Sequence, residues 1–176
     1  GDSWDTVYFD FAKAFDRVPH QRLLNKVHNL GIRGNLYRWI EDFLHNRKQR
    51  VVLGNCKSEW SNVTSGIPQG SVLGPILFII FINDLPEKIK STVKIFADDT
   101  KLYRAIRSIN DYEDLQADIE SMAHWATKWQ LPFNDTKCKV IHYGKKNPRH
   151  QYLLNQTTIP VANALVFDWT DHARSQ

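Results

Sequence analysis

The stretch VKIFADDTKLYRAI, from Val93 to Ile106, decides the fold that this sequence predicts. Short runs rich in β-branched and aromatic residues flank two adjacent aspartates, Asp98 and Asp99. Aspartate is a good turn former, and two such runs on either side of a turn are typical of a β-hairpin. We therefore expect two antiparallel strands that carry a pair of carboxylates at their tip.

Segments on both sides of this hairpin predict further strands and helices. The stretches with the composition of strands are TVYFDF (6–11), RVVL (50–53), EWSNVT (59–64) and KCKVIHYG (137–144). The stretches with apolar residues at helical spacing are 19–30, 35–46, 76–85 and a long helix that Asp111 opens. The order of these elements predicts an α+β fold, with helices packed on one face of an antiparallel sheet.

Composition places the chain among globular proteins. Of its 176 residues, 42% are hydrophobic and 24% are charged, which excludes a disordered or fibrous chain. The formal net charge of +4 is only a mild indication of a nucleic-acid ligand. Residues 43–58 and 136–167 contain basic residues and no acids. These two segments could bind phosphates or form a solvated surface, and their charge alone leaves both explanations open.

The sequence lacks the signatures of a structural zinc site, a membrane span and several common catalytic motifs. Cys56 and Cys138 stand far apart without zinc-ligand spacing, although they could form one disulfide. The longest apolar run, from Ile76 to Ile82, is too short to span a bilayer, so we expect no membrane partner. No Walker loop, GxSxG or HExxH motif is present.

Three carboxylates are the first candidates for chemistry. Asp10 ends the first predicted strand, and Asp98 and Asp99 lie at the tip of the hairpin. If the strand pairs beside the hairpin, all three meet at one edge of a sheet. Hard oxygen ligands of this kind suit Mg²⁺, and two such ions can promote phosphoryl transfer. The alternative is that Asp98 and Asp99 simply form a turn.

The loop SGIPQGSVLGP is the second candidate, with Gln69 as a polar contact for a ligand. Its structural alternative is a turn before a helix, with Ser71 as N-cap and Pro75 in the first turn. Phe15 could equally be a core aromatic residue, and Lys137 a surface charge on the last strand.

Five blocks in this order resemble the reverse transcriptase of non-LTR (LINE-type) retrotransposons. They are YFDFAKAFDRVPH, SGIPQGSVLGPILF, FINDLP, FADDTKLY and WQLPFNDTKCKVIHYG. The resemblance covers roughly residues 6–155, and it implies a polymerase palm domain over residues 1–155 with truncated fingers and thumb. Residues 156–176 do not match the family and form a divergent C-terminal segment.

The resemblance assigns roles to the acidic residues. Asp10 falls on the metal-binding aspartate of motif A, and the backbone carbonyl of Phe11 would be an extra ligand. Asp98 and Asp99 fall on the aspartate pair of motif C, with Asp98 as the more direct ligand. The implied cofactor is Mg²⁺, as two ions, with Mn²⁺ possible.

It also assigns roles to residues that would contact the nucleotide. Phe15 falls on the aromatic gate that excludes a ribose 2′-OH. Gln69 and Gly70 fall on the motif B loop. Lys137 falls near the motif D lysine that is proposed to protonate the pyrophosphate leaving group, and Lys139 is an alternative. The implied partners are an RNA template, a DNA primer and dNTP, and the implied location is intracellular, with the nucleus expected.

Two other functions remain open at this level. One is a non-catalytic remnant of such an element, which binds RNA or DNA through the basic segments. The other is a protein-interaction module based on Trp4, Trp39 and Trp60, which exposed aromatic side chains could support.

Overall fold

The computed structural model describes residues 2–163, and the chain divides into two compact units. Gly1–Lys13 and Asp84–Gln176 form one unit, which we call the sheet unit. Ala14–Asn83 form the other, which we call the helical unit. The chain therefore starts in the sheet unit, leaves it after Lys13 and returns to it at Asp84.

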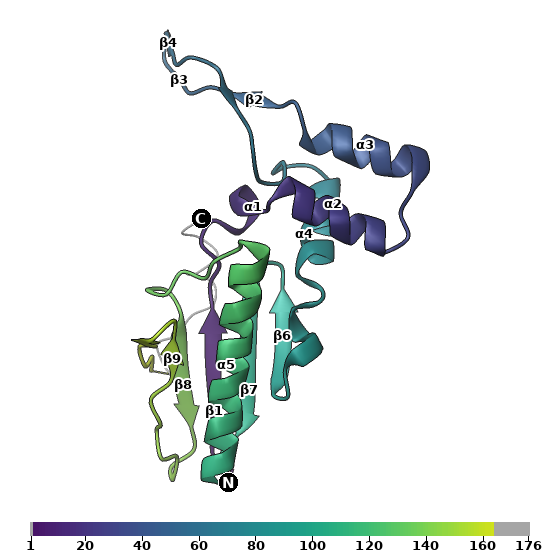
Figure 1. The fold of residues 1–176 in the computed structure, drawn as a ribbon. Coiled ribbons are helices and arrows are strands. Elements are labelled where there is room, and N and C mark those ends of the chain that lie inside the picture. Colours follow the sequence, from purple (N-terminus) through teal and green to yellow (C-terminus); the bar gives the residue numbers. More distant parts are fainter. Residues whose placement is uncertain (1, 164–176) are drawn as a thin grey trace. The chain divides into compact units, whose positions relative to one another are not determined.

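A four-stranded antiparallel sheet forms the sheet unit, with the strand order β6-β7-β1-β8 (Figure 1). Its strands are β1 (Trp4–Phe9), β6 (Thr92–Phe96), β7 (Asp99–Ala105) and β8 (Lys139–Tyr143). The first strand of the chain pairs with β7 on one side and β8 on the other. This central position explains why residues 5–9 are all buried.

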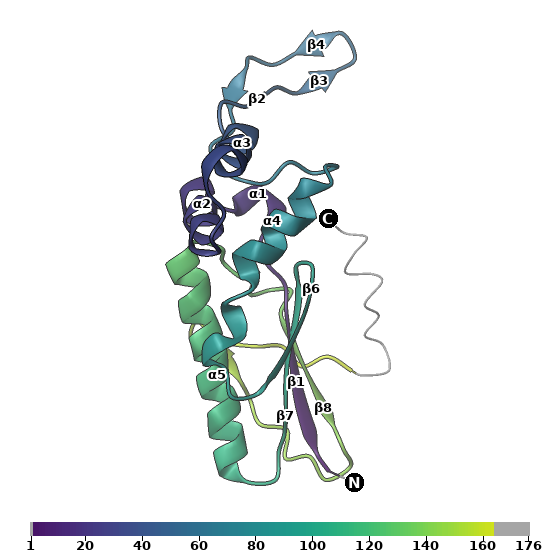
Figure 2. The ribbon, with the colours of Figure 1, turned by 90° about the vertical axis from the view of Figure 1, so that its right-hand side faces the viewer.

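Helix α5 (Ile109–Trp129) covers one face of this sheet (Figure 2). It begins two residues before Asp111, because Ser108 is the N-cap and forms a reciprocal capping box with Asp111. Its buried stripe, predicted from the three- and four-residue spacing, includes Leu115, Ile119 and Met122. The helix ends at Trp129, and its C-cap residue, Gln130, adopts the left-handed conformation with φ 58°.

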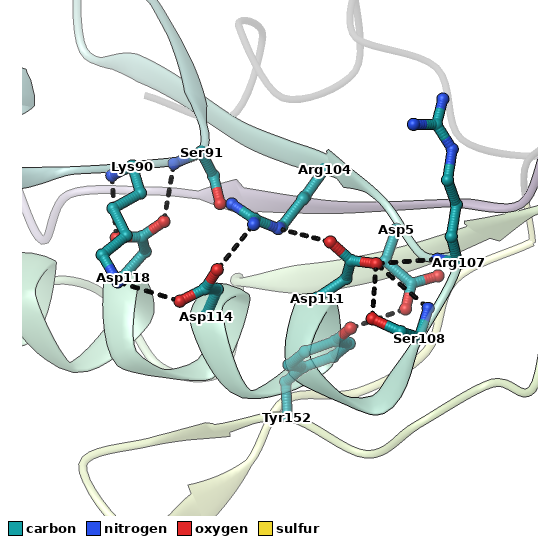
Figure 3. A network of polar contacts seen from close by, with 10 residues as sticks. All are labelled: Asp5, Lys90, Ser91, Arg104, Arg107, Ser108, Asp111, Asp114, Asp118 and Tyr152. Atoms are coloured by element: carbon teal, nitrogen blue, oxygen red, sulfur yellow. Dashed lines mark hydrogen bonds and ion pairs between the residues drawn. The ribbon is translucent and has the colours of Figure 1, made fainter.

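Polar contacts fix the register of α5 along the sheet (Figure 3). Arg104 of β7 forms ion pairs with Asp111 and Asp114 at 3.4 and 2.6 Å. Asp118, which is 3% exposed, accepts hydrogen bonds from the backbone N–H groups of Lys90 and Ser91 at 3.0 and 2.7 Å. Because Lys90 and Ser91 directly precede β6 and Arg104 lies in β7, the contacts join the helix to the predicted hairpin.

A buried carboxylate on β1 connects the C-terminal part of the described chain to the sheet. Asp5 is fully buried and accepts hydrogen bonds from His142 Nδ1 at 2.7 Å, Asn147 Nδ2 at 2.7 Å and Tyr152 OH at 2.6 Å. Burial alone would raise the pKa of Asp5, but hydrogen bonds from His142, Tyr152 and Asn147 lower it below its usual value. The carboxylate therefore stays ionised inside the fold.

A short hairpin follows this network. Its strands are β9 (Leu153–Leu154) and β10 (Thr157–Thr158). The domain boundary predicted after Asn155 lies in the turn of this hairpin, and it remains a prediction. Most of the predicted divergent segment, residues 164–176, lies outside the described residues.

Helices and a long hairpin form the helical unit. The helices are α1 (Ala14–Arg17), α2 (His20–Asn29), α3 (Gly34–Leu44) and α4 (Leu73–Ile82). The hairpin strands are β2 (Lys48–Gln49), β3 (Val52–Leu53), β4 (Cys56–Lys57) and β5 (Ser61–Asn62). The core residues that α2, α3 and α4 bury are Leu23, Leu24, Val27, Ile40, Leu44, Leu77, Phe78 and Phe81.

Helix α4 begins and ends three residues earlier than the predicted range of 76–85. The N-cap residue is Val72 and not Ser71 as expected. Ser71 Oγ, one position earlier, still accepts a hydrogen bond from the N–H of Gly74 in the first turn, at 3.0 Å. Pro75 fits the first turn, because its missing N–H would have no partner there. Leu85 belongs instead to a short 3₁₀ helix, η1 (Leu85–Lys88), in the sheet unit.

One buried cation lies at the end of α4. Lys26 of α2 is 7% exposed, and its Nζ donates to the carbonyl of Phe81 and lies 4.9 Å from the centre of the Phe81 ring. The C-terminal carbonyls of a helix attract a positive charge, so this position stabilises both the lysine and the helix end.

Two further expectations concern the cysteines and the membrane. Cys56 is exposed and Cys138 is buried, and both are free thiols, so the disulfide that two cysteines would allow is not formed. Among residues 2–163, no helix has the length and apolar character needed to cross a membrane.

Candidate active site

Asp10 stands directly after β1, where the central strand of the sheet ends. The residue is 3% exposed, and its Oδ2 lies 3.9 Å from Lys137 Nζ. Its carbonyl accepts a hydrogen bond from the N–H of Asn134 at 2.7 Å. The loop before β8 therefore holds the backbone of Asp10 and brings a cation to its carboxylate.

The predicted hairpin of residues 93–106 is confirmed as β6 and β7, and its turn carries the other two carboxylates. Phe96 pairs with Asp99, so the turn consists of Ala97 and Asp98. Ala97 adopts φ 53°, a left-handed conformation that tight hairpin turns require. Asp98 thus lies in the turn itself, whereas Asp99 is the first residue of β7.

Strand register relates these carboxylates to Asp10. Phe9 of β1 pairs with Thr100 of β7, and one more step in the same register sets Asp10 opposite Asp99. Directly opposed residues of antiparallel strands project from the same face of a sheet. The described residues nevertheless contain no group of three or more His, Cys, Asp or Glu side chains that could hold a metal ion. The structure thus brings Asp10 and Asp99 to the same end of neighbouring strands without gathering all three predicted ligands.

Phe11 is held firmly at the same end of β1. Its ring is 1% exposed and stacks on Phe133, with ring centres 4.6 Å apart. Phe11 and Phe133 also pair as an isolated antiparallel β-bridge. On either side of this bridge, the carbonyl of Asp10 accepts from the N–H of Asn134, and the N–H of Ala12 donates to the carbonyl of Pro132 at 2.9 Å. Because successive carbonyls of an extended chain point in opposite directions, the Phe11 carbonyl points away from the Phe133 segment.

The structure distinguishes the two candidate lysines. Lys137 lies beside Asp10, whereas Lys139 Nζ donates to the carbonyl of Thr136 at 3.0 Å. Cys138 stands between them and is buried, and this burial raises the pKa of its thiol to about 12. The thiol is therefore protonated at neutral pH and is not a nucleophile.

Phe15, Gln69 and Gly70 lie in the helical unit. The half-buried ring of Phe15 stacks on Phe78 at a centre-to-centre distance of 4.6 Å and an interplanar angle of 23°. Gln69 is exposed and its Nε2 donates to Asp16 Oδ1 at 3.2 Å. Gly70 is exposed and adopts φ 79°.

Backbone hydrogen bonds bind the predicted SGIPQGS loop to the segment that contains Phe15. The N–H of Ile67 donates to the carbonyl of Phe15 at 2.7 Å, and the N–H of Gly66 donates to the carbonyl of Val18 at 2.9 Å. Ser65 Oγ donates to the carbonyl of Asp16 at 2.9 Å. The loop is therefore part of a fixed substructure and not a flexible connection.

Asp16 and His20 were not identified from the sequence, yet both hold this loop. Buried His20 donates from Nε2 to the carbonyl of Gly66 at 2.7 Å, and Asp16 orients the side chain of Gln69. Burial lowers the pKa of His20, which keeps its ring neutral. The only sequence signal was their place in FDFAKAFDRVPH, the block that also contains Asp10 and Phe15.

Comparison with known proteins identifies the family. Residues 2–161 match the family model described as reverse transcriptase (RNA-dependent DNA polymerase). The chain belongs to this reverse transcriptase family. The match confirms the family that the sequence blocks indicated, and it extends six residues beyond the predicted boundary at Asn155.

Similar proteins come from mobile genetic elements. An RNA-directed DNA polymerase from mobile element jockey of Drosophila funebris is 34% identical over 147 residues, which cover 78% of this chain and 16% of that protein. A probable RNA-directed DNA polymerase from transposon X-element of Drosophila melanogaster is 28% identical over 168 residues, or 91% of this chain and 18% of that protein. The reverse transcriptase chain thus spans less than a fifth of the length of these relatives.

Solved structures agree with the fold. A telomerase of Candida tropicalis, solved with a TWJ fragment of telomeric RNA, superposes with a TM-score of 0.61 at 12% identity, covering 83% of this chain and 27% of that one. The corresponding Candida albicans structure gives a TM-score of 0.58 at 13% identity, with 86% and 29% coverage. The prediction of an α+β fold, with helices and an antiparallel sheet, is confirmed.

Proposed function

We propose that this chain is the palm of an RNA-directed DNA polymerase, which transfers a nucleotide from dNTP to a primer 3′-OH on an RNA template. The observation that carries this proposal is the register of β1 and β7, which sets Asp10 opposite Asp99 at the end of neighbouring strands. A nucleotidyl transferase needs carboxylates at one place on a rigid support, and adjacent strands of a sheet provide it.

The proposed metal ligands are the carboxylates of Asp10, Asp98 and Asp99 and the carbonyl of Phe11. All four supply hard oxygen atoms, which is the donor set that Mg²⁺ prefers, so the residues fit two Mg²⁺ ions chemically. Bound Mg²⁺ would stabilise the charge that develops on phosphate oxygens and lower the pKa of the primer 3′-OH. The chain itself contributes rigidity, because Phe11 and the backbone of Asp10 are fixed by the Phe133–Asn134 segment.

Lys137 is the proposed general acid. Its ammonium group lies 3.9 Å from Asp10 Oδ2 and about one third of its side chain is exposed, so it can meet a ligand from solvent. A proton held there could pass to the pyrophosphate oxygen as the bond to the α-phosphate breaks. Lys139 fits this role less well, because its ammonium group donates to the carbonyl of Thr136.

Phe15, Gln69 and Gly70 are the proposed nucleotide contacts. Stacking on Phe78 fixes the ring plane of Phe15, and a fixed ring can exclude a ribose 2′-OH by steric overlap. Asp16 holds the side-chain amide of Gln69, and the positive φ of Gly70 exposes backbone without a side chain. RNA template, DNA primer and dNTP are the proposed partners, and the nucleus is the proposed location.

The test is primer extension on an RNA template by this chain with Mg²⁺, with Asp98→Asn as the main variant. This substitution keeps the size of the side chain and removes its charge. We expect it to abolish extension while RNA affinity stays equal or rises, because a negative charge near phosphates is lost. Asp42→Asn, an exposed acid on α3, is the matched control and should extend normally.

Two results would overturn the proposal. Normal extension by Asp98→Asn would remove this residue from the mechanism. Absence of extension by the unsubstituted chain, when circular dichroism shows that it is folded, would favour the non-catalytic remnant for the chain as it stands.

A further inference from the structure

The hairpin of residues 47–63, which we call the arm, is the most exposed part of the helical unit (Figure 1). It consists of two short ladders, β2–β5 and β3–β4, and every residue in both ladders is exposed. Trp60 is 58% exposed and Leu53 is 81% exposed. A two-stranded hairpin without a core is marginally stable by itself, so these side chains do not serve to bury apolar surface.

The two ladders of the arm have different registers. Lys48 pairs with Asn62 in the first ladder, and one more pair beyond Gln49 and Ser61 sets Arg50 opposite Trp60. In the second ladder Val52 pairs with Lys57. The second strand therefore contains one extra residue between the ladders, as in a β-bulge.

Register places three of the four cations of the arm on one face. Side chains alternate along a strand, and opposed residues share a face, so Lys48, Arg50 and Val52 lie on the same face as Lys57 and Trp60. The contact between Arg50 Cζ and the Trp60 ring, at 4.5 Å from the ring centre, agrees with this assignment. We call this the basic-aromatic face.

The opposite face of the arm has a different character. Arg47 lies there with Gln49, Val51 and Leu53, because these residues alternate with those of the basic-aromatic face. Across residues 47–63, all of which the structure describes, Glu59 is the one acidic residue, and it lies at the bulge. The basic-aromatic face therefore combines three cations and an indole ring. None of the residues paired in the two ladders is acidic.

We propose that the basic-aromatic face binds a single strand of RNA. Lys48, Arg50 and Lys57 would contact successive phosphates, and the Arg50–Trp60 pair would provide a surface on which a base stacks. Proteins bind single strands by this combination of a positively charged track and aromatic or guanidinium stacking surfaces. The choice of RNA rests on the proposed function, but the arm contains none of the proposed catalytic residues.

Neighbouring cations on opposite faces allow a matched test. The variants Lys48→Gln and Arg47→Gln carry the same charge change at adjacent positions. We would measure the affinity of each, and of the unsubstituted chain, for a labelled single-stranded RNA by fluorescence anisotropy at several salt concentrations, without nucleotide or divalent metal. Loss of one phosphate contact to a single strand reduces the slope of log K against log salt by about 0.7. We expect this reduction for Lys48→Gln and an unchanged slope for Arg47→Gln.

Trp60→Leu tests the stacking part of the proposal. We expect it to weaken binding of single-stranded RNA roughly tenfold, because a stacked base loses its partner. Binding of duplex RNA should change little, because paired bases are not available to stack on the indole. Single-stranded DNA is the comparison that reports whether the 2′-OH contributes.

Several outcomes would overturn the proposal. They are equal slopes for Lys48→Gln and Arg47→Gln, unchanged RNA affinity in Trp60→Leu, or loss of binding in Leu53→Ser with all cations intact, which would indicate use of the opposite face. Asp98→Asn separates this proposal from the proposed function. If it extends primers normally while the arm variants lose RNA binding, only the catalytic assignment fails.

Discussion

Gly66 is the position where a single added methyl group should have the clearest effect. It adopts φ 90°, and a Cβ at this position would lie 2.7 Å from the carbonyl oxygen of Asp16 and 2.9 Å from its carbonyl carbon and Cα. All three atoms are backbone, so no side chain can turn away. In Gly66→Ala the loop must move, which would separate the amide of Ile67 from the carbonyl of Phe15.

Gly70 supplies the matched comparison, because it has a similar φ of 79°, but apart from its two chain neighbours no residue has an atom within 4 Å of where an alanine methyl group would lie. A left-handed conformation costs a non-glycine residue about 1–2 kcal/mol. Alanine also restricts the unfolded chain more than glycine does, which offsets about 0.4–1 kcal/mol of this loss in stability. Overpacking adds about 1–3 kcal/mol at Gly66 alone. We therefore expect a loss of unfolding free energy of roughly 3 kcal/mol for Gly66→Ala and roughly 1 kcal/mol for Gly70→Ala.

Urea denaturation followed by far-ultraviolet circular dichroism measures both losses under the same conditions. The difference between the two variants isolates the steric contribution, since the backbone strain is similar in both. Equal unfolding free energies for Gly66→Ala and Gly70→Ala would show that the loop does not pack against Asp16 as described.

Three further substitutions have defined outcomes. Tyr152→Phe removes one hydrogen bond from ionised Asp5 and should lower the unfolding free energy by about 1.5–3 kcal/mol at pH 7. Because the pKa of Asp5 lies below its ordinary 3.8, its stabilising effect is present above that pH and is lost as pH falls through the folded-state value, so the gap between the two proteins should close in acid. Burial lowers the pKa of His20 from 6.5, so stability should fall as pH drops below 6.5, and urea titrations should show a weaker fall in His20→Gln. Parallel pH profiles would contradict this. Phe15→Ala should let a primer-extending enzyme accept rNTP more readily, and unchanged dNTP preference would argue against the gate.

Local sequence patterns predicted helices and strands well where two independent signals agreed at the same place. The hairpin of residues 93–106 was confirmed because β-branched runs and a turn signal agreed at the same place. The first strand was expected at 6–11 and lies at Trp4–Phe9. Its shift follows from pairing, because Trp4 is opposite Ala105 on one side and Tyr143 on the other.

Contacts between distant segments gave no local signal. Asp5 and Tyr152 are 147 positions apart, and nothing in either neighbourhood indicates that they meet. Likewise, Asp16 and Gln69 are 53 positions apart. The family resemblance assigned Gln69 a role, but the residue that orients it became visible only when the loop and α1 were seen packed together.

The arm shows why charge along a sequence does not define a binding face. If the register of the first ladder continued, Lys57 would lie opposite Leu53 and would face away from Lys48 and Arg50. The extra residue near Glu59 shifts the pairing by one, so Lys57 lies opposite Val52 instead. A shift of one residue moves every later side chain to the other face. The bulge therefore places Lys57 on the same face as Lys48 and Arg50. The three cations then form one surface that fits a polyanion, which their positions in the sequence alone do not show.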